Sequence, residues 1–181
     1  MAPKSKTVEE KYQKLTQIEH ILKRPDTYIG DTALQKEKQY VYENEKIIKK
    51  EIVYPPGLMK IFDEILVNAR DHYVIDPYCD TIKVTIDISQ NEISVMNNGK
   101  GIDIEIHKEH NVYVPELIFG HLLTSTNYDD TEKRTTGGRT GYGAKLTNIF
   151  SNFFSITTID GKTKKNIIKN LKIIWEKKAN Q

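Results

Sequence analysis

The sequence predicts an α+β domain, and three of its features indicate this class. Apolar residues recur at the spacing of one helix face from Leu58 to about His72, which predicts a long amphipathic helix. Segments 82–88 and 92–96 follow it with alternating apolar and polar residues, as expected of two strands joined by a turn. A glycine-rich loop, 136–145, then precedes a second apolar helical pattern. Helices and paired strands in this order are typical of α+β domains.

The N-terminal third is charged and contains fewer clear elements. Apolar residues from Tyr12 to Leu22 have near-helical spacing, and Pro25 is expected to end that helix. Residues 39–43 and 47–53 suit a strand pair, and Pro55-Pro56-Gly57 precedes the long helix.

The C-terminal half begins with a long excursion, 103–136, of the kind that forms lids. It contains a short helix around 115–123 and a polar acidic stretch at 125–130. Beyond the glycine loop, 154–159 is expected to be a strand, and 164–175 suits either a strand or a helix.

Length and charge bound the function. The chain of 181 residues is long enough for one core, with one domain and an arm. Its formal net charge of +2 does not indicate nucleic-acid binding by the whole chain. Lysines do crowd the C-terminal end, and we interpret them as a solvated face or frayed tail in preference to a DNA-facing patch: Lys162, Lys164, Lys165, Lys169, Lys172, Lys177 and Lys178.

Cysteine content and hydropathy indicate an intracellular protein with no membrane partner. Cys79 is the single cysteine, so an internal disulfide and a cysteine metal cluster are excluded. We expect a small buried or half-buried side chain, with a reactive thiol as the minor alternative. The apolar runs are too short to cross a membrane, and residues 1–10 lack the apolar stretch of a secretory signal.

The long helix and the strand after it carry candidate site residues. Glu64, Asn68 and Asp71 recur at i, i+4 and i+7, so they share one line beside the apolar stripe. Period two places Asn97 on the inward face where its strand ends, and Asn98–Ile102 forms a glycine-dependent turn. Each pattern alone also suits an ordinary polar helix edge or turn.

The glycine-rich loop suits a phosphate. Four of the ten glycines fall between Thr136 and Lys145, and glycine lets the backbone approach a ligand closely. A helix that begins behind it directs free N–H groups at the same place. The spacing fits neither a P-loop nor a dinucleotide fingerprint, because Ala144 separates Gly143 from Lys145 and Leu146 replaces the third glycine. A mobile surface loop is the alternative.

Together these three motifs resemble the N, G1 and G2 boxes of the GHKL ATPases, the superfamily of gyrase, Hsp90, histidine kinases and MutL. Segments 60–69, 112–120 and 137–146 are similar to eukaryotic-type DNA topoisomerase II, and 11–14 and 20–30 resemble its N-terminal arm. The resemblance implies a GHKL (Bergerat) fold, a two-layer sandwich of a mixed β-sheet covered by helices on one face. Residues 1–30 would be a dimerisation arm, and 31–181 the ATP-binding domain.

The resemblance also implies roles for individual residues. Glu64 would be the general base that activates water, and Asn68 a ligand of Mg²⁺ as well as of the nucleotide. Asn97 would read the adenine, and Tyr12 would reach the nucleotide of a partner subunit. The remaining contacts to ribose and phosphates would come from the lid and the glycine loop: Ser125, Thr126, Asn127, Gly138, Arg139, Thr140, Gly141, Tyr142, Gly143, Ala144 and Lys145.

The sequence departs from the family at three places. His72 stands where an asparagine is usual, and we interpret it as a solvated helix end; Thr140 replaces another asparagine. The likeness fades after about Ile159, and the last strands, the transducer domain and its lysine are missing. We therefore expect a fold that is incomplete at the C-terminus, from a fragment, a truncated gene model or a degenerate copy, with marginal stability.

The implied function is the ATPase region of a type IIA DNA topoisomerase. It would bind and hydrolyse Mg·ATP, form a homodimer through the arm, act on double-stranded DNA through the parent enzyme, and lie in the nucleus. A truncated, non-hydrolysing nucleotide-binding or dimerisation module is the alternative. A histidine kinase or Hsp90 relative is disfavoured by Glu64, by the 113–120 segment and by the arm.

Overall fold

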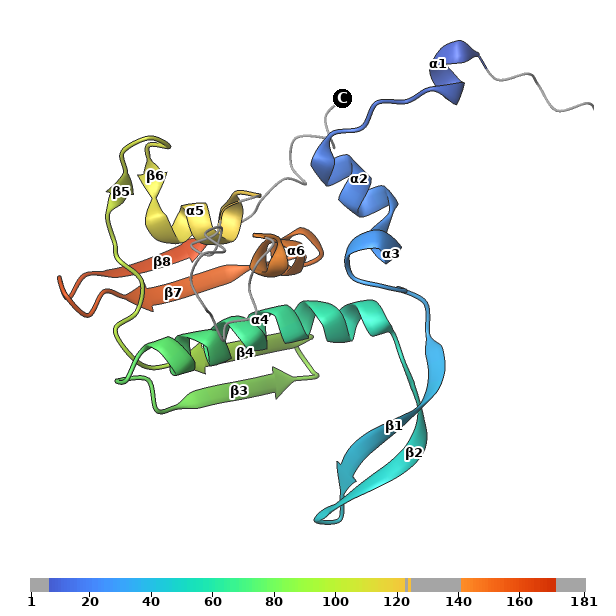
Figure 1. The fold of residues 1–181 in the computed structure, drawn as a ribbon, viewed down its shortest axis with the longest axis horizontal. Helices are drawn as coiled ribbons and strands as arrows, with labels where there is room; N and C mark the ends of the chain where they lie inside the picture. Colours follow the sequence, from blue (N-terminus) through green and yellow to red (C-terminus); the bar gives the residue numbers. More distant parts are fainter. Residues whose placement is uncertain (1–6, 123, 125–140, 172–181) are drawn as a thin grey trace, which may run out of the picture.

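The computed structural model describes residues 7–122, 124 and 141–171, and Figure 1 shows how their elements are arranged. In chain order the elements are α1 (Val8–Lys11), α2 (Gln17–Lys23), α3 (Pro25–Tyr28), β1 (Gln35–Glu43), β2 (Lys46–Tyr54), α4 (Pro56–Ile75), β3 (Ile82–Asp87), β4 (Glu92–Asn97), β5 (Ile106–His107), β6 (Val112–Tyr113), α5 (Val114–Gly120), α6 (Gly143–Ile149), β7 (Ser155–Ile159) and β8 (Asn166–Asn170).

Helix α4 is the long helix that the sequence predicts, and it is longer at both ends. Pro56 occupies its first turn, where a missing N–H costs nothing, and its C-terminal cap is Asp76. The helix packs on β3, β4 and α6, and in Figure 1 it crosses in front of β4. The expected apolar stripe is buried unevenly, because Leu58 at its start is 53% exposed whereas Ala69 is 5% exposed.

The described strands pair as antiparallel two-stranded ladders, β1–β2, β3–β4, β5–β6 and β7–β8. The expected pairs at 39–43 with 47–53 and at 82–88 with 92–96 are confirmed, and the segment left open at 164–175 contains strand β8. Strands β5 and β6 were not predicted, because two residues are too few to show an alternating pattern.

Loop contacts join the β3–β4 hairpin to the β7–β8 hairpin. Gly161 N donates to Lys100 O at 2.7 Å, and Ile102 N donates to Thr158 Oγ1 at 3.2 Å, so the chain leaving β4 lies against the β7–β8 hairpin. Helices α4, α5 and α6 cover one side of these strands (Figure 1). All strand pairs among the described residues are antiparallel, and each forms a two-stranded sheet of its own.

The buried core joins the N-terminal segment to α6. Ile21 and Ile29 cluster with Leu146 and Ile149, and Ile21 is fully buried. Helix α2 begins at a capping box between Thr16 and Glu19. Segment 17–29 is thus packed on the domain, whereas α1 projects away from it (Figure 1). The division of the chain at residue 30 stays a prediction.

Two smaller expectations have clear outcomes. Pro25 ends α2 as predicted, but it also opens the short helix α3, since proline is tolerated at a first helical position. Cys79 is buried and 4% exposed, as expected of a small core side chain. None of the described helices is long and apolar enough to span a bilayer.

Substitution of Ile21 by Ala should lower the free energy of unfolding by about 2–5 kcal/mol, because the cavity forms where α2 meets α6. Urea denaturation followed by circular dichroism measures this loss. Ile47→Ala, at a position that is 73% exposed on β2, serves as the control and should change it by less than about 0.5 kcal/mol. Equal effects of the two substitutions would contradict this account of the core.

Candidate functional site

The carboxylate of Glu64 lies against the first residue of α6. A Cβ placed on Gly143 would overlap Glu64 Oε2 and would lie 3.3 Å from Cδ, so the present position of the Glu64 carboxylate depends on glycine at position 143. The other oxygen, Oε1, is 2.5 Å from Lys60 Nζ, and the Glu64 side chain is 23% exposed. The hydrogen bond to Glu64 raises the pKa of Lys60. The predicted N box and the end of the glycine loop therefore meet at one carboxylate.

Asn68 and Asn97 lie farther along the same helix and on the adjacent strand. Asn68 is exposed on α4, one turn beyond Glu64. Asn97 is the last residue of β4, on which α4 packs, and it is half-buried. Its Nδ2 donates to Asn98 O at 3.0 Å. The two carboxamides thus come from α4 and from the strand on which it packs, with Asn68 exposed and Asn97 half-buried.

A buried aspartate that the sequence analysis did not single out positions the turn after β4. Asp76 is 4% exposed; its Oδ2 accepts from Lys100 N at 2.6 Å and its Oδ1 from Tyr78 N at 3.1 Å. Gly99 has φ +117°, and a Cβ there would lie 2.6 Å from Asp76 Oδ2. The end of α4 therefore fixes the predicted G1 turn. The sequence feature that could have indicated this role is an aspartate directly after a helix, a residue type whose side chain often accepts hydrogen bonds from nearby backbone N–H groups.

The interpretation of His72 as a solvated helix end is wrong. Its side chain is 23% exposed, and its Nε2 lies 3.2 Å from Asp76 Oδ2, one turn farther along the helix. This nitrogen is buried and makes no hydrogen bond within the described part of the chain. The histidine ring and the carboxylate therefore lie close together without a hydrogen bond between them. A Cβ on Gly99 would lie 2.9 Å from the same nitrogen. His72 therefore faces the G1 turn because Asp76 and Gly99 enclose it.

Lys145 points into the protein. It is 6% exposed, its Nζ donates to Thr124 O at 2.5 Å, and burial lowers its pKa to about 8. Thr124 Oγ1 in turn donates to Leu117 O and His121 O at the end of α5. Lys145 thus joins α6 to the residue that precedes the predicted lid contacts 125–127, and its predicted contact with phosphates stays a prediction.

Side-chain hydrogen bonds join α6 and its N-cap residue to three neighbouring helices. Thr147 Oγ1 donates to Ile61 O of α4 at 2.8 Å, and Asn148 Nδ2 donates to Phe119 O of α5 at 3.1 Å. Tyr142 is the N-cap residue of α6, and its hydroxyl oxygen accepts a hydrogen bond from Gln17 Nε2. The helix behind the glycine loop is therefore positioned from three sides.

The other predicted site residues are placed as follows. Gly141 has φ +67°, which favours glycine, and Ala144 is 5% exposed inside α6. Tyr12 follows α1 directly and is 80% exposed, so it is not brought to Glu64 within this chain. The remaining predicted contacts lie outside the described residues: Ser125, Thr126, Asn127, Gly138, Arg139 and Thr140.

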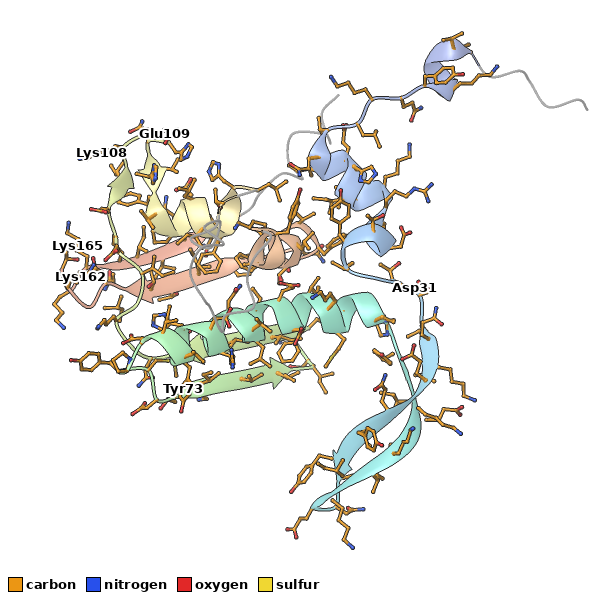
Figure 2. All side chains as sticks on the ribbon, viewed as in Figure 1. Asp31, Tyr73, Lys108, Glu109, Lys162 and Lys165 are labelled. Carbon is orange, nitrogen blue, oxygen red and sulfur yellow. The ribbon has the colours of Figure 1, made fainter. Side chains whose placement is uncertain are left out.

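The β7–β8 hairpin carries the described part of the C-terminal lysine cluster. Lys162 pairs with Asp103 at 2.7 Å and is 73% exposed, which confirms a solvated position, and Figure 2 shows Lys162 and Lys165 at the outer edge of the hairpin. An open hollow of about 710 Å³ lies between this hairpin, Ile104 and Tyr113, and none of the predicted site residues that the structure describes lines it. Because neither Glu64 nor the described end of the glycine loop, 141–145, borders this hollow, we do not assign the nucleotide to it.

Acid should destabilise the protein through Asp76. Bonds from Lys100 N and Tyr78 N, with the charges of His72 and Lys100, hold its pKa below the usual 3.8 although burial opposes them. The folded state favours the ionised carboxylate, so Asp76 contributes its full stabilisation above the unfolded pKa of about 3.8. This stabilisation is lost as the pH falls through the lower pKa of the folded state. Asp76→Asn should lower the urea midpoint of unfolding at neutral pH. In this variant the midpoint should also decrease less as the pH is lowered. Asp63→Asn, exposed on the same helix, should keep the steeper fall of the unsubstituted chain, and identical profiles for the two variants would contradict this role.

Comparison with known proteins agrees with this geometry. The family described as histidine kinase-, DNA gyrase B- and HSP90-like ATPase matches residues 54–168. Among curated relatives, DNA topoisomerase 2 of Pisum sativum is 62% identical over 158 residues, which are 87% of this chain and 11% of the relative. That of Saccharomyces cerevisiae is 56% identical over 162 residues, 88% of this chain and 11% of the relative.

Solved structures show the same fold. The ATPase region of Saccharomyces cerevisiae topoisomerase II superposes with a TM-score of 0.88 at 53% identity, covering 90% of this chain and 44% of that one. The ATPase and transducer domains of DNA topoisomerase II from Balamuthia mandrillaris superpose with a TM-score of 0.84 at 46% identity. This match covers 96% of this chain and 48% of that one. The expected α+β GHKL fold is confirmed.

The chain spans about a tenth of the curated relatives it matches. Its family match nevertheless extends from the end of β2 to β8 and includes Glu64, Asn97 and α6. The chain therefore belongs to the histidine kinase-, DNA gyrase B- and HSP90-like ATPase family, and over most of its length it is similar to the ATPase region of type II DNA topoisomerases.

Proposed function

We propose that the chain binds Mg·ATP and hydrolyses it as the ATPase region of a type IIA DNA topoisomerase. The observation that carries the proposal is the Glu64 carboxylate, half-buried and in contact with the first residue of the helix behind the glycine loop. A carboxylate at this point can reach a water beside the terminal phosphate that the loop holds. Family membership and the fold support the same reaction.

In this proposal Glu64 accepts the proton of the attacking water. The water oxygen forms a bond to the γ-phosphorus, the bond to the bridging oxygen breaks, and ADP leaves with the electron pair. Lys60, 2.5 Å from Oε1, fixes the carboxylate so that the other oxygen faces Gly143. A positioned base of this kind contributes about 10²–10⁴-fold to a rate.

Asn68 is the residue we assign to Mg²⁺. Its carboxamide is exposed one helical turn from Glu64, and a neutral oxygen donor fits a hard cation that is also held by phosphate oxygens. When bound, the ion would neutralise charge on the phosphates. Asn68 would then hold the ion, and Glu64 would hold the attacking water, at the same phosphate group.

The nucleotide would lie between α4, the turn after β4 and the start of α6. We assign the adenine to Asn97, whose half-buried position at the end of β4 suits a base-reading amide. Backbone N–H groups at Gly141–Lys145 would face the phosphates, with Gly138, Arg139 and Thr140 before them and Ser125, Thr126 and Asn127 on the lid. Asp76 and His72 support this pocket by fixing the G1 turn.

The rest of the function belongs to the whole enzyme. The curated relatives carry the name DNA topoisomerase 2, and we propose that this chain works with the remainder of such an enzyme on double-stranded DNA in the nucleus. Residues 1–30 would form the arm of a homodimer. Tyr12, 80% exposed beyond α1, is free to reach the nucleotide of a partner subunit.

A nucleotide-binding or dimerisation module that does not hydrolyse ATP is the second candidate. The observation that favours it is Lys145, whose Nζ donates to the Thr124 carbonyl and whose burial lowers its pKa to about 8. A cation directed inward in this way adds little charge stabilisation to a phosphoryl transition state.

Measurement of ATP turnover for the full chain and for Glu64→Gln tests the hydrolytic proposal. We expect at least about a 10²-fold fall in turnover, because the amide cannot accept the proton, with nucleotide affinity retained. Glu92→Gln, at an exposed position at the start of β4, is the matched control and should keep the full rate. Equal turnover in all three proteins, with binding intact, would reject hydrolysis and leave the binding module.

A further inference from the structure

We propose that the tip of the β5–β6 hairpin binds a transition-metal ion through His107, Glu109 and His110. One ligand atom from each of these residues lies within 4.8 Å of the other two, and they form the one such group found among the described residues. The ion would be of the zinc, copper(II) or nickel(II) class, and the site is separate from the Mg·ATP site proposed at Glu64 and Asn68.

The two imidazole rings already face each other. Their centroids are 4.8 Å apart and their planes are inclined by 27°. His107 Nδ1 is buried and has no hydrogen-bond partner within the part of the chain that the structure describes. A buried nitrogen without a partner costs free energy, and such exceptions often mark a missing ion or water. A metal ion beside the stacked rings, in the plane of the His107 ring, would give this nitrogen its partner.

The backbone brings the three residues together through a short loop. Strand β5 ends at His107 and β6 begins at Val112, and Asn111 N donates to His107 O at 2.8 Å. Asn111 has φ +54°, a conformation that asparagine tolerates. The loop therefore returns His110 over His107. Figure 2 shows Glu109 and Lys108 at the tip of this hairpin, on the far side of α5 from α4.

The donor set selects the kind of ion. Two imidazole nitrogens and one carboxylate suit Zn²⁺, Cu²⁺ or Ni²⁺, whereas Mg²⁺ and Ca²⁺ prefer oxygen ligands alone. Glu109 and His110 are exposed, so they can turn toward His107 and reach bonding distance, and water would complete the coordination. The exposed ammonium of Lys108, next in sequence to His107, opposes a cation and limits the affinity.

A metal ion here would stabilise the hairpin. The ladder has two residue pairs, Ile106 with Tyr113 and His107 with Val112, and so short a ladder has little stability of its own. Val114 N, at the start of α5, donates to Glu105 O at 3.0 Å. A link between the strand end and the loop would therefore fix the point from which α5 begins, and binding to the folded state should raise the melting temperature.

Isothermal titration of the full chain with ZnCl₂ and with NiCl₂, without nucleotide, tests the site. We expect one ion per chain, and at least about a tenfold weaker affinity in His110→Asn and in Glu109→Gln. His121→Asn removes an exposed histidine outside the cluster and should bind as the unsubstituted chain does. Co²⁺ should show ligand-field absorption that His110→Asn abolishes, and MgCl₂ should not displace it.

Four results would overturn the proposal. The first is the absence of stoichiometric binding by the unsubstituted chain when circular dichroism shows it to be folded. The second is equal affinity in the unsubstituted chain, His110→Asn and Glu109→Gln. The third is an equal loss in His121→Asn, which would place the ion elsewhere. Lys108→Ser keeps all three ligands, so weaker binding in that variant would also contradict the assignment.

Discussion

The close approach of α6 to α4 at Gly143 is the constraint on which the candidate site depends. With a hydrogen in place of a side chain, the first residue of α6 contacts the Glu64 carboxylate directly. Thr147 and Asn148 then reach the carbonyls of Ile61 and Phe119. A larger residue at position 143 would displace the carboxylate, the flexible end of the Glu64 side chain, and so move the proposed base away from the end of the glycine loop.

Helix α4 extends this constraint along the site. Glu64, Asn68, His72 and Asp76 are spaced four residues apart, so they follow one slowly turning line of the helix. The first contacts α6, and the last binds the turn after β4 through Lys100 N. One rigid element therefore sets the distance between the phosphate side and the base side of the proposed pocket, and nucleotide geometry should respond to changes at either end of α4.

Local patterns in the sequence predicted the elements well and the contacts between them poorly. Periodicity predicted α4, the β3–β4 hairpin and a helix behind the glycine loop, because each is specified by its own residues. It did not show that Asp76 binds Lys100 or that Lys145 turns inward to Thr124, since both contacts join residues far apart in the chain. His72 was misjudged for the same reason, because its burial comes from Gly99.

A double-mutant cycle on Gly143→Ala and Glu64→Ala, followed by urea unfolding, tests the central claim most directly. In the unsubstituted background Gly143→Ala should destabilise the protein, because the added Cβ meets the Glu64 carboxylate. In the Glu64→Ala background the nearest remaining atom is a Cβ at 3.6 Å, so the same substitution should be neutral or stabilising by up to about 1 kcal/mol. The account predicts a coupling free energy of about 0.5–3 kcal/mol. Additive effects would show that Gly143 and Glu64 do not meet, which would contradict it.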